Sequence, residues 1–90
     1  MIDNFDDLKR EWRYMKQDRY LFNVSLIYGK YEPSIGNDHD HCEFCGEKFF
    51  QRDGFLHEGY CTPDKYRWIC KNCFNDFKIM FQWNVTKKEN

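Results

Sequence analysis

Two Cys-x-x-Cys pairs constrain the fold of this chain more than any other feature. The first pair is Cys42 and Cys45, the second is Cys70 and Cys73, and 24 residues separate them. Tetrahedral Zn²⁺ binds four thiolates at about 2.3 Å, and each pair can supply two of them from one tight turn. The sequence therefore predicts one structural zinc ion, held by these four cysteines, that joins two distant parts of the chain.

Other chemistries also use paired cysteines. A thioredoxin-type redox site needs a βαβ setting, which the pattern of these 90 residues does not offer. An iron–sulfur cluster takes four thiolates too, so it stays open as an alternative. Zinc is favoured because two pairs at this separation fit a metal site better than they fit a redox site.

The cysteine count and the apolar pattern predict where the chain resides. Five cysteines is an odd number, and the chain opens without the charged-then-apolar pattern of a secretory leader. No apolar run reaches the roughly 20 residues that span a bilayer. These features predict a reducing, cytoplasmic setting without a membrane partner, where paired cysteines bind metal more often than they form disulfides.

The length and the charge of the chain limit which architectures and which partners are expected. Ninety residues predict one domain, 1–90, with an N-terminal helix, strand and loop over 1–41 and a zinc module over 42–84. A chain this short buries a modest core, so a structural metal is a sensible supplement. The chain has 14 basic and 15 acidic side chains, whereas proteins that mainly bind phosphates usually carry a basic excess. Nucleic acid is therefore a less favoured partner than protein.

Apolar residues near the N-terminus recur at helical spacing. They predict a helix from Phe5 to about Gln17. Its predicted buried stripe consists of Phe5, Leu8, Trp12 and Met15. The opposite side is basic and predicts a solvated face or, alternatively, a stripe that binds phosphate or a partner. The residues on that side are Lys9, Arg13 and Lys16.

Alternation replaces helical spacing further along the chain. Residues 20–28 predict a strand, because every second residue from Phe22 to Tyr28 is apolar. A continuation of the preceding helix stays open as the alternative. Turn-forming residues then dominate 29–40. That composition predicts a loop that delivers the chain to the first cysteine pair.

The zinc module is predicted to contain a hairpin and a helix. Residues 55–61 and 66–70 predict two paired strands, with turn chemistry at 62–65 between them. From Asn72, a reasonable N-cap, the pattern becomes helical and Cys73 falls in the first turn. The predicted buried face of this helix consists of Phe74, Phe77, Met80 and Phe81.

This order of elements resembles the treble-clef zinc finger, in which a turn holds two ligands, a hairpin follows, and the first turn of a helix holds the last ligand. The resemblance covers Cys42 to about Trp83, just under half the chain. It implies an α+β fold in which zinc stabilises a knuckle, a β-hairpin and a C-terminal helix, with an N-terminal helix and strand added. It also implies the ligands Cys42, Cys45, Cys70 and Cys73. The whole chain is similar to small bacterial zinc-binding proteins, but treble clefs serve many unrelated roles.

Residues 38–41 place two histidines and two carboxylates immediately before the first cysteine pair. We expect a polar loop, or hydrogen-bonding groups that support the zinc turn. Alternate residues of an extended segment lie on the same side, so His39 and His41 could instead bind a second metal. A third alternative is that His41 replaces one cysteine as a zinc ligand.

His57 adds a catalytic alternative. HNH-type nucleases place a treble-clef hairpin and helix around one divalent cation, and in that family a histidine near the end of the first strand activates water. A metal-dependent nuclease or hydrolase that uses His39, His41 or His57 is therefore a second hypothesis. The Asp-His dipeptide and the later Asn/His pair of that family do not appear at matching positions. We therefore expect His57 to be an ordinary, partly exposed strand residue.

Two further expectations concern burial. Cys61 belongs to neither pair, and we expect it to be buried as a small apolar residue. Aromatic residues make up 20% of the chain, more than a domain of this size can hide. The surplus, including Ile79 and Trp83, predicts an exposed apolar patch of the kind that marks a partner site.

The favoured function is a non-enzymatic, zinc-binding protein-interaction module, for example a small regulator or inhibitor. A closed set of four cysteine ligands, near-neutral charge and surplus aromatics support it. The nuclease is the second hypothesis. The third is a nucleic-acid-binding zinc finger whose cations are Lys9, Arg13 and Lys16, or Lys87 and Lys88. Neither the identity of the protein partner nor the oligomeric state follows from the sequence.

Overall fold

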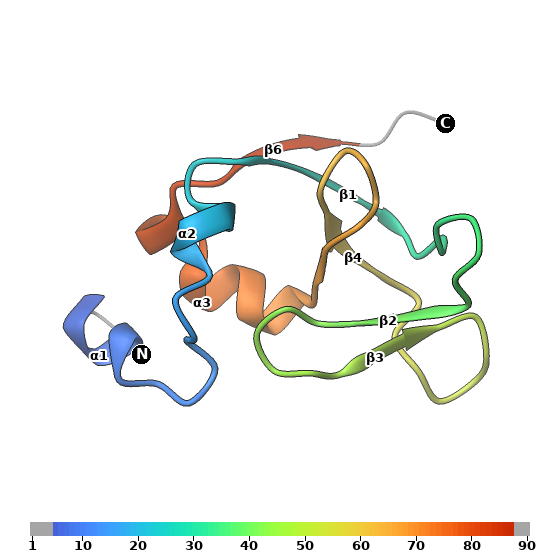
Figure 1. The fold of residues 1–90 in the computed structure, drawn as a ribbon, viewed down its shortest axis with the longest axis horizontal. Coiled ribbons are helices and arrows are strands. Elements are labelled where there is room, and N and C mark those ends of the chain that lie inside the picture. Colours follow the sequence, from blue (N-terminus) through green and yellow to red (C-terminus); the bar gives the residue numbers. More distant parts are fainter. Residues whose placement is uncertain (1–4, 88–90) are drawn as a thin grey trace.

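A computed structural model describes residues 5–87 of the chain, and their helices and strands form a mixed α+β fold, as predicted (Figure 1). The helices are α1 (Phe5–Lys9), α2 (Asp18–Leu21) and α3 (Lys71–Phe81). The strands are β1 (Ser25–Lys30), β2 (His39–His41), β3 (Lys48–Phe50), β4 (Glu58–Cys61), β5 (Trp68–Ile69) and β6 (Asn84–Lys87).

The larger sheet has the strand order β5-β4-β1-β6. Strand β4 pairs antiparallel with both β1 and β5, so the predicted hairpin is present, with shorter strands than expected. Strand β6 follows α3 and pairs in parallel with β1, as the two segments at the top of Figure 1 show. We did not predict β6, because its partner strand lies far away in the sequence and the segment itself is short and polar.

The smaller sheet is the antiparallel hairpin of β2 and β3, which carries the first cysteine pair in its connection. The amide of Cys42 donates to the carbonyl of Glu47 at 2.8 Å, and the amide of Gly46 donates to the carbonyl of Cys42 at 3.0 Å. Gly46 has a φ of 80°, a conformation that suits glycine. These bonds close the connection into one tight turn, which brings both cysteine side chains of the pair to the same place.

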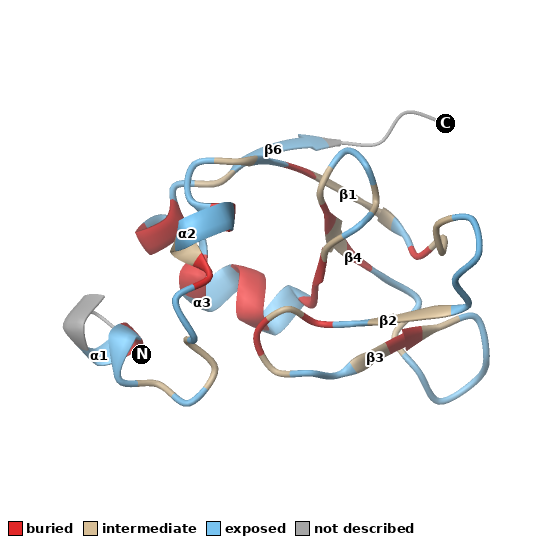
Figure 2. Cartoon of the chain, viewed as in Figure 1, coloured by how far each residue is buried: buried red, intermediate tan, exposed pale blue. Residues whose placement is uncertain are grey.

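The larger sheet lies between α3 and the smaller sheet. Successive residues of a strand face opposite sides of the sheet, so Gly59 and Tyr60 of β4 lie on its two opposite faces. The ring of Tyr60 stacks on Phe74 of α3, with 3.7 Å between ring centroids. On the other face, Gly59 lies against the ring of Phe49 in β3. The predicted buried face of α3 is confirmed (Figure 2): Phe74, Phe77, Met80 and Phe81 are all buried.

Gly59 is required for space rather than for backbone conformation. A β-carbon at this position would lie 2.8 Å from the carbonyl oxygen of Ile69 and 2.8 Å from Cε1 of Phe49. We expect Gly59→Ala to lower the free energy of unfolding by about 1–3 kcal/mol, because the two layers must separate to admit the methyl group. Urea unfolding measures this loss. In a double-mutant cycle, Phe49→Leu should relieve part of it, and strictly additive losses would contradict the proposed clash.

The prediction for residues 5–17 is wrong beyond the first turns. Helix α1 ends at Lys9, and the chain continues irregularly. Leu8 is buried as expected, but Trp12 and Met15 are 71% and 70% exposed. A short isolated helix is only marginally stable, so contacts with the rest of the fold can impose a conformation other than the helix that the apolar spacing predicts.

The boundaries of the next segments also differ from the prediction. Helix α2 takes the first two residues of the predicted strand, 20–21, and Asn23 then has a left-handed conformation with a φ of 58°. The strand begins at Ser25 and extends to Lys30. The predicted loop 29–40 is therefore shorter, because its ends belong to β1 and β2.

Candidate metal centre

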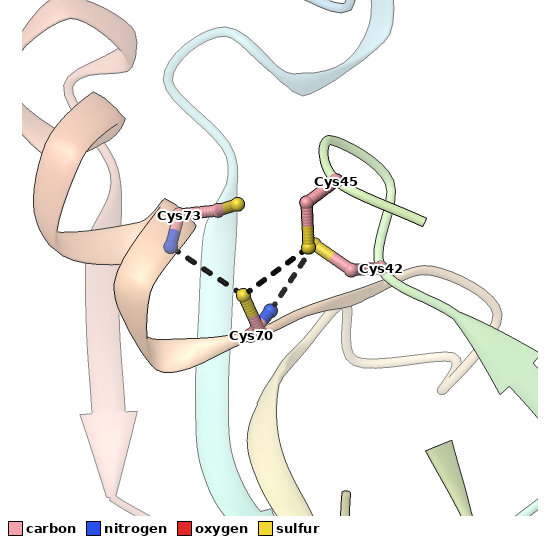
Figure 3. A group of neighbouring side chains, drawn as sticks. All are labelled: Cys42, Cys45, Cys70 and Cys73. Atoms are coloured by element: carbon pink, nitrogen blue, oxygen red, sulfur yellow. Dashed lines mark hydrogen bonds between the residues drawn. The ribbon is translucent and has the colours of Figure 1, made fainter. Parts of the chain in front are cut away.

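The four cysteines of the two pairs converge on one point. Their sulfurs all lie within 4.8 Å of one another, so they could hold a single metal ion. Figure 3 shows Cys42 and Cys45 reaching this point from the turn after β2, and Cys70 and Cys73 reaching it from the start of α3. Cys45 is partly exposed and the other three are buried. The pattern in the sequence thus brings together the four side chains that it predicted.

Backbone amides around the cluster point at its sulfurs. The amides of Phe44 and Cys70 each donate to Sγ of Cys42 at 3.4 Å. The amide of Cys73 donates to Sγ of Cys70 at 3.5 Å. Such donors disperse negative charge on thiolates and orient them toward a shared cation. The last bond also makes Cys70 the N-cap of α3, so the prediction of Asn72 as the cap is wrong.

The protonation of the cluster reflects how close the sulfurs are. Hydrogen bonds from Cys70 and then Cys73 lower the pKa of Cys42. The bond to Cys42 raises the pKa of Cys70 to about 12, and bonds with Cys42 and then Cys70 raise that of Cys73. Four adjacent thiolates would repel one another, and this repulsion opposes the ionisation of all four at once. A divalent ion would remove that repulsion, so the donor set fits a thiophilic metal such as zinc.

Arg13 lies beside the cluster, although the sequence placed it on a solvated face. Its Nη1 donates to Sγ of Cys73 at 3.5 Å, and its guanidinium lies 5.1 Å from the ring centroid of Phe77. Two carboxylates hold the side chain in place: Nη2 lies 2.6 Å from Glu11 and 3.0 Å from Asp76. Only 11% of the side chain is exposed. No local pattern signalled this role, since Arg13 and Cys73 are 60 residues apart.

We expect Arg13→Gln to speed the loss of metal from the cluster. The change removes a charged donor from Cys73 and leaves Glu11 and Asp76 without their shared cation. Outer contacts of this kind are typically worth about 10-fold or more in metal affinity. Competition with a chromogenic chelator measures the effect. Arg10→Gln is the matched control, because Arg10 is exposed, and an equal change in both variants would contradict the role of Arg13.

Gln17 fastens the same N-terminal segment to the turn of the first cysteine pair. Its side chain is buried, with 1% of the residue exposed. Nε2 donates to the carbonyls of Glu43 and Arg13 at 3.0 and 2.9 Å, and Oε1 accepts from the amide of Met15 at 2.6 Å. Residues 13–17 are thereby held against the cluster. Sequence reasoning missed Gln17, because a polar residue in an amphipathic pattern predicts exposure.

The histidines stay outside the cluster. Among residues 5–87, the four cysteines are the only set of three or more cysteine, histidine or acidic side chains placed to share one ion. His41 is therefore not grouped with the sulfurs, and its Nδ1 lies 3.1 Å from the carbonyl of Gly46. His57 is exposed, precedes β4, and places Nε2 2.6 Å from the carbonyl of Arg52. No three-ligand catalytic metal site forms from these residues within the described part of the chain.

The other predicted residues fall in several places. Cys61 is buried in β4, as expected, and lies outside the four-sulfur cluster. Ile79 is 70% exposed, in line with the predicted apolar surplus, whereas Trp83 is partly buried and donates through Nε1 to the carbonyl of Leu21 at 2.8 Å. Of the cations considered for nucleic acid, Lys9 and Lys16 are exposed, while Lys88 lies outside the described residues.

Comparisons of the chain with protein-family models, with curated proteins and with solved structures found no match. No helix within residues 5–87 is long and apolar enough to cross a membrane.

Proposed function

We propose that this protein is a zinc-stabilised, non-enzymatic module that binds another protein. The observation that carries the zinc assignment is the convergence of four sulfurs within 4.8 Å, from the turn after β2 and from the start of α3. Four protein ligands fill a tetrahedral ion and leave no position for substrate, which is typical of structural rather than catalytic zinc. Four thiols that bind metal must stay reduced, which favours a cytoplasmic setting.

The arrangement of elements supports a treble-clef interpretation of this module. The β2–β3 turn supplies the first two sulfurs, the β4–β5 hairpin follows, and α3 supplies the last two from its N-cap and first turn. In such an arrangement, the metal joins the β2–β3 turn to the start of α3 and supplements the modest core of a small domain. A structural role for the ion is therefore favoured over a transported or catalytic one.

The partner assignment rests on the exposed apolar side chains of the N-terminal segment. Trp12 and Met15 are 71% and 70% exposed. They flank Arg13 and precede Gln17, whose side chains are held against the metal cluster. The two apolar side chains are thus presented to solvent by an anchored segment. Large exposed apolar residues on a rigid support are typical of protein-binding surfaces, and tryptophan is prominent among their strongest contributors.

Two measurements test the proposal. Elemental analysis after gel filtration should find one tightly held zinc per chain; iron, or no metal, would overturn the zinc assignment. A protein captured by the tagged chain, once purified, should lose at least about tenfold in affinity for a Trp12→Ala/Met15→Ala variant, because hot-spot truncations cost about 2 kcal/mol or more. Ile35→Ala is the matched control, since Ile35 is a fully exposed apolar residue in another segment. Equal binding by all three proteins would exclude this surface.

A further inference from the structure

We propose that His39 and His41 form a second metal site, separate from the four cysteines, that binds a divalent transition-metal ion such as Zn²⁺ through their two Nε2 atoms. Both residues belong to the short strand β2, which ends just before Cys42. The proposal goes beyond the structural zinc, because it concerns imidazole ligands on a partly exposed strand.

The hydrogen bonds of the two rings identify which nitrogen is available to a metal. Nδ1 of His41 lies 3.1 Å from the carbonyl of Gly46, which can only accept, so this Nδ1 carries the proton. Nδ1 of His39 lies 2.6 Å from the carboxylate of Asp38, which gives the same tautomer. In each neutral ring, Nε2 then bears the lone pair. No described residue hydrogen-bonds to either Nε2.

This pattern is the one found around histidines that bind metals. A ligating histidine nearly always donates its other ring N–H to a carboxylate or to a backbone carbonyl, which fixes the ring and raises the basicity of the ligating nitrogen. Here Asp38 serves His39 and the carbonyl of Gly46 serves His41. The second partner belongs to the turn that carries the first cysteine pair, so the folded turn itself orients His41.

The spacing of the rings suits one shared ion. Residues i and i+2 of a strand lie on the same face, and the ring centroids of His39 and His41 are 5.2 Å apart. Two imidazoles on a tetrahedral ion, with Zn–N bonds of about 2.0–2.1 Å, have centroids roughly 5 Å apart. The intervening Asp40 faces the other way, where its carboxylate accepts from Tyr31 at 2.8 Å. The carboxylate of Asp40 is therefore not available to an ion held by the two imidazoles.

Two ligands leave half of a tetrahedral ion open to water. This site should therefore exchange its metal readily, whereas the four-sulfur cluster should retain its ion through gel filtration. The chemistry also separates the two sites, because imidazoles accept nickel and copper as well as zinc, while four thiolates favour zinc or an iron–sulfur cluster.

Calorimetric titration of Zn²⁺ into protein that already holds one equivalent of zinc tests the inference. We expect a second, weaker equivalent to bind, and His39→Gln and His41→Gln each to weaken it by at least about tenfold, since each removes half of the ligands. His57→Gln is the matched control, because Nε2 of His57 is hydrogen-bonded to the backbone carbonyl of Arg52. Absence of a second equivalent, an unchanged titration in both variants, or an equal loss in the control would overturn the site. The zinc retained before titration reports on the cysteine cluster separately.

A measurement on the unaltered chain guards against variants that fail to fold. Diethyl pyrocarbonate modifies accessible imidazole nitrogens, and mass spectrometry locates the products. Added Zn²⁺ should slow modification of His39 and His41 severalfold and leave the rate at His57 unchanged. Equal protection of all three histidines, or protection of none, would overturn the proposal.

Discussion

Replacing Cys73 with serine is expected to unfold the region around the metal centre and to release the metal. Structural zinc binding contributes on the order of 10 kcal/mol to folds of this size, which is as much as the whole stability of a typical domain. Cys73 is buried, and its sulfur lies among the other three within 4.8 Å. Circular dichroism, thermal melting and zinc content measure the loss. Removal of metal from the unaltered protein by a strong chelator should produce the same spectrum.

Cys61→Ser is the matched control for this experiment. Cys61 is equally buried but lies outside the cluster, so the variant should keep its zinc and lose only a modest part of its stability. Stoichiometric loss of zinc from Cys61→Ser would show that the ligands are wrongly assigned. An unchanged melting curve for Cys73→Ser, or for the chelated protein, would remove the structural role of the metal altogether.

Phe77→Ala is expected to have the next largest effect, a loss of about 3–5 kcal/mol in the free energy of unfolding. Phe77 has no exposed surface. Its ring stacks on Phe44 of the cysteine turn, with 4.7 Å between ring centroids, and its centroid lies 5.9 Å from that of Phe81. The guanidinium carbon of Arg13 lies 5.1 Å from the ring centroid of Phe77. The cavity would therefore open where the helix, the first cysteine pair and the N-terminal segment meet. Urea unfolding of the zinc-loaded protein measures the loss.

Ile79 provides the control on the same helix. It is 70% exposed, so Ile79→Ala should change the free energy of unfolding by no more than about 0.5 kcal/mol. Equal losses in the two variants would mean that α3 does not pack as described. Faster metal release from Phe77→Ala than from Ile79→Ala would show that the aromatic contact with Phe44 also stabilises the cysteine turn.

Features that depend on neighbouring residues could be predicted well. The buried face of α3 follows from helical spacing, and the β4–β5 hairpin follows from two short apolar segments around a turn. The clustering of the four cysteines follows from their spacing, since each pair lies in one turn and two such pairs are typical of a single metal site. In each case the physical cause operates within a few residues, or through a ligand set that a sequence displays directly.

Features that depend on distant contacts could not be predicted. The period of residues 5–17 indicated a helix, but Gln17 forms hydrogen bonds to Glu43 and Arg13, and the chain follows an irregular path to satisfy them. Strand β6 has no strong pattern of its own, and it exists because β1 offers a free edge. The intrinsic conformational preference of each segment contributes less free energy than a buried polar contact or the pairing of two strands.

The sequence by itself determined the clustering of the four cysteines, the α+β class and the apolar face of the last helix, because each is encoded by residue type at short spacing. Only the tertiary structure decided that Arg13 faces Cys73, that Gly59 must lack a side chain, and that both histidines of β2 keep Nε2 available. These properties arise from atoms brought together across as many as 60 residues of chain. The free energy of such contacts depends on where the fold places each group, and that position has no local signature.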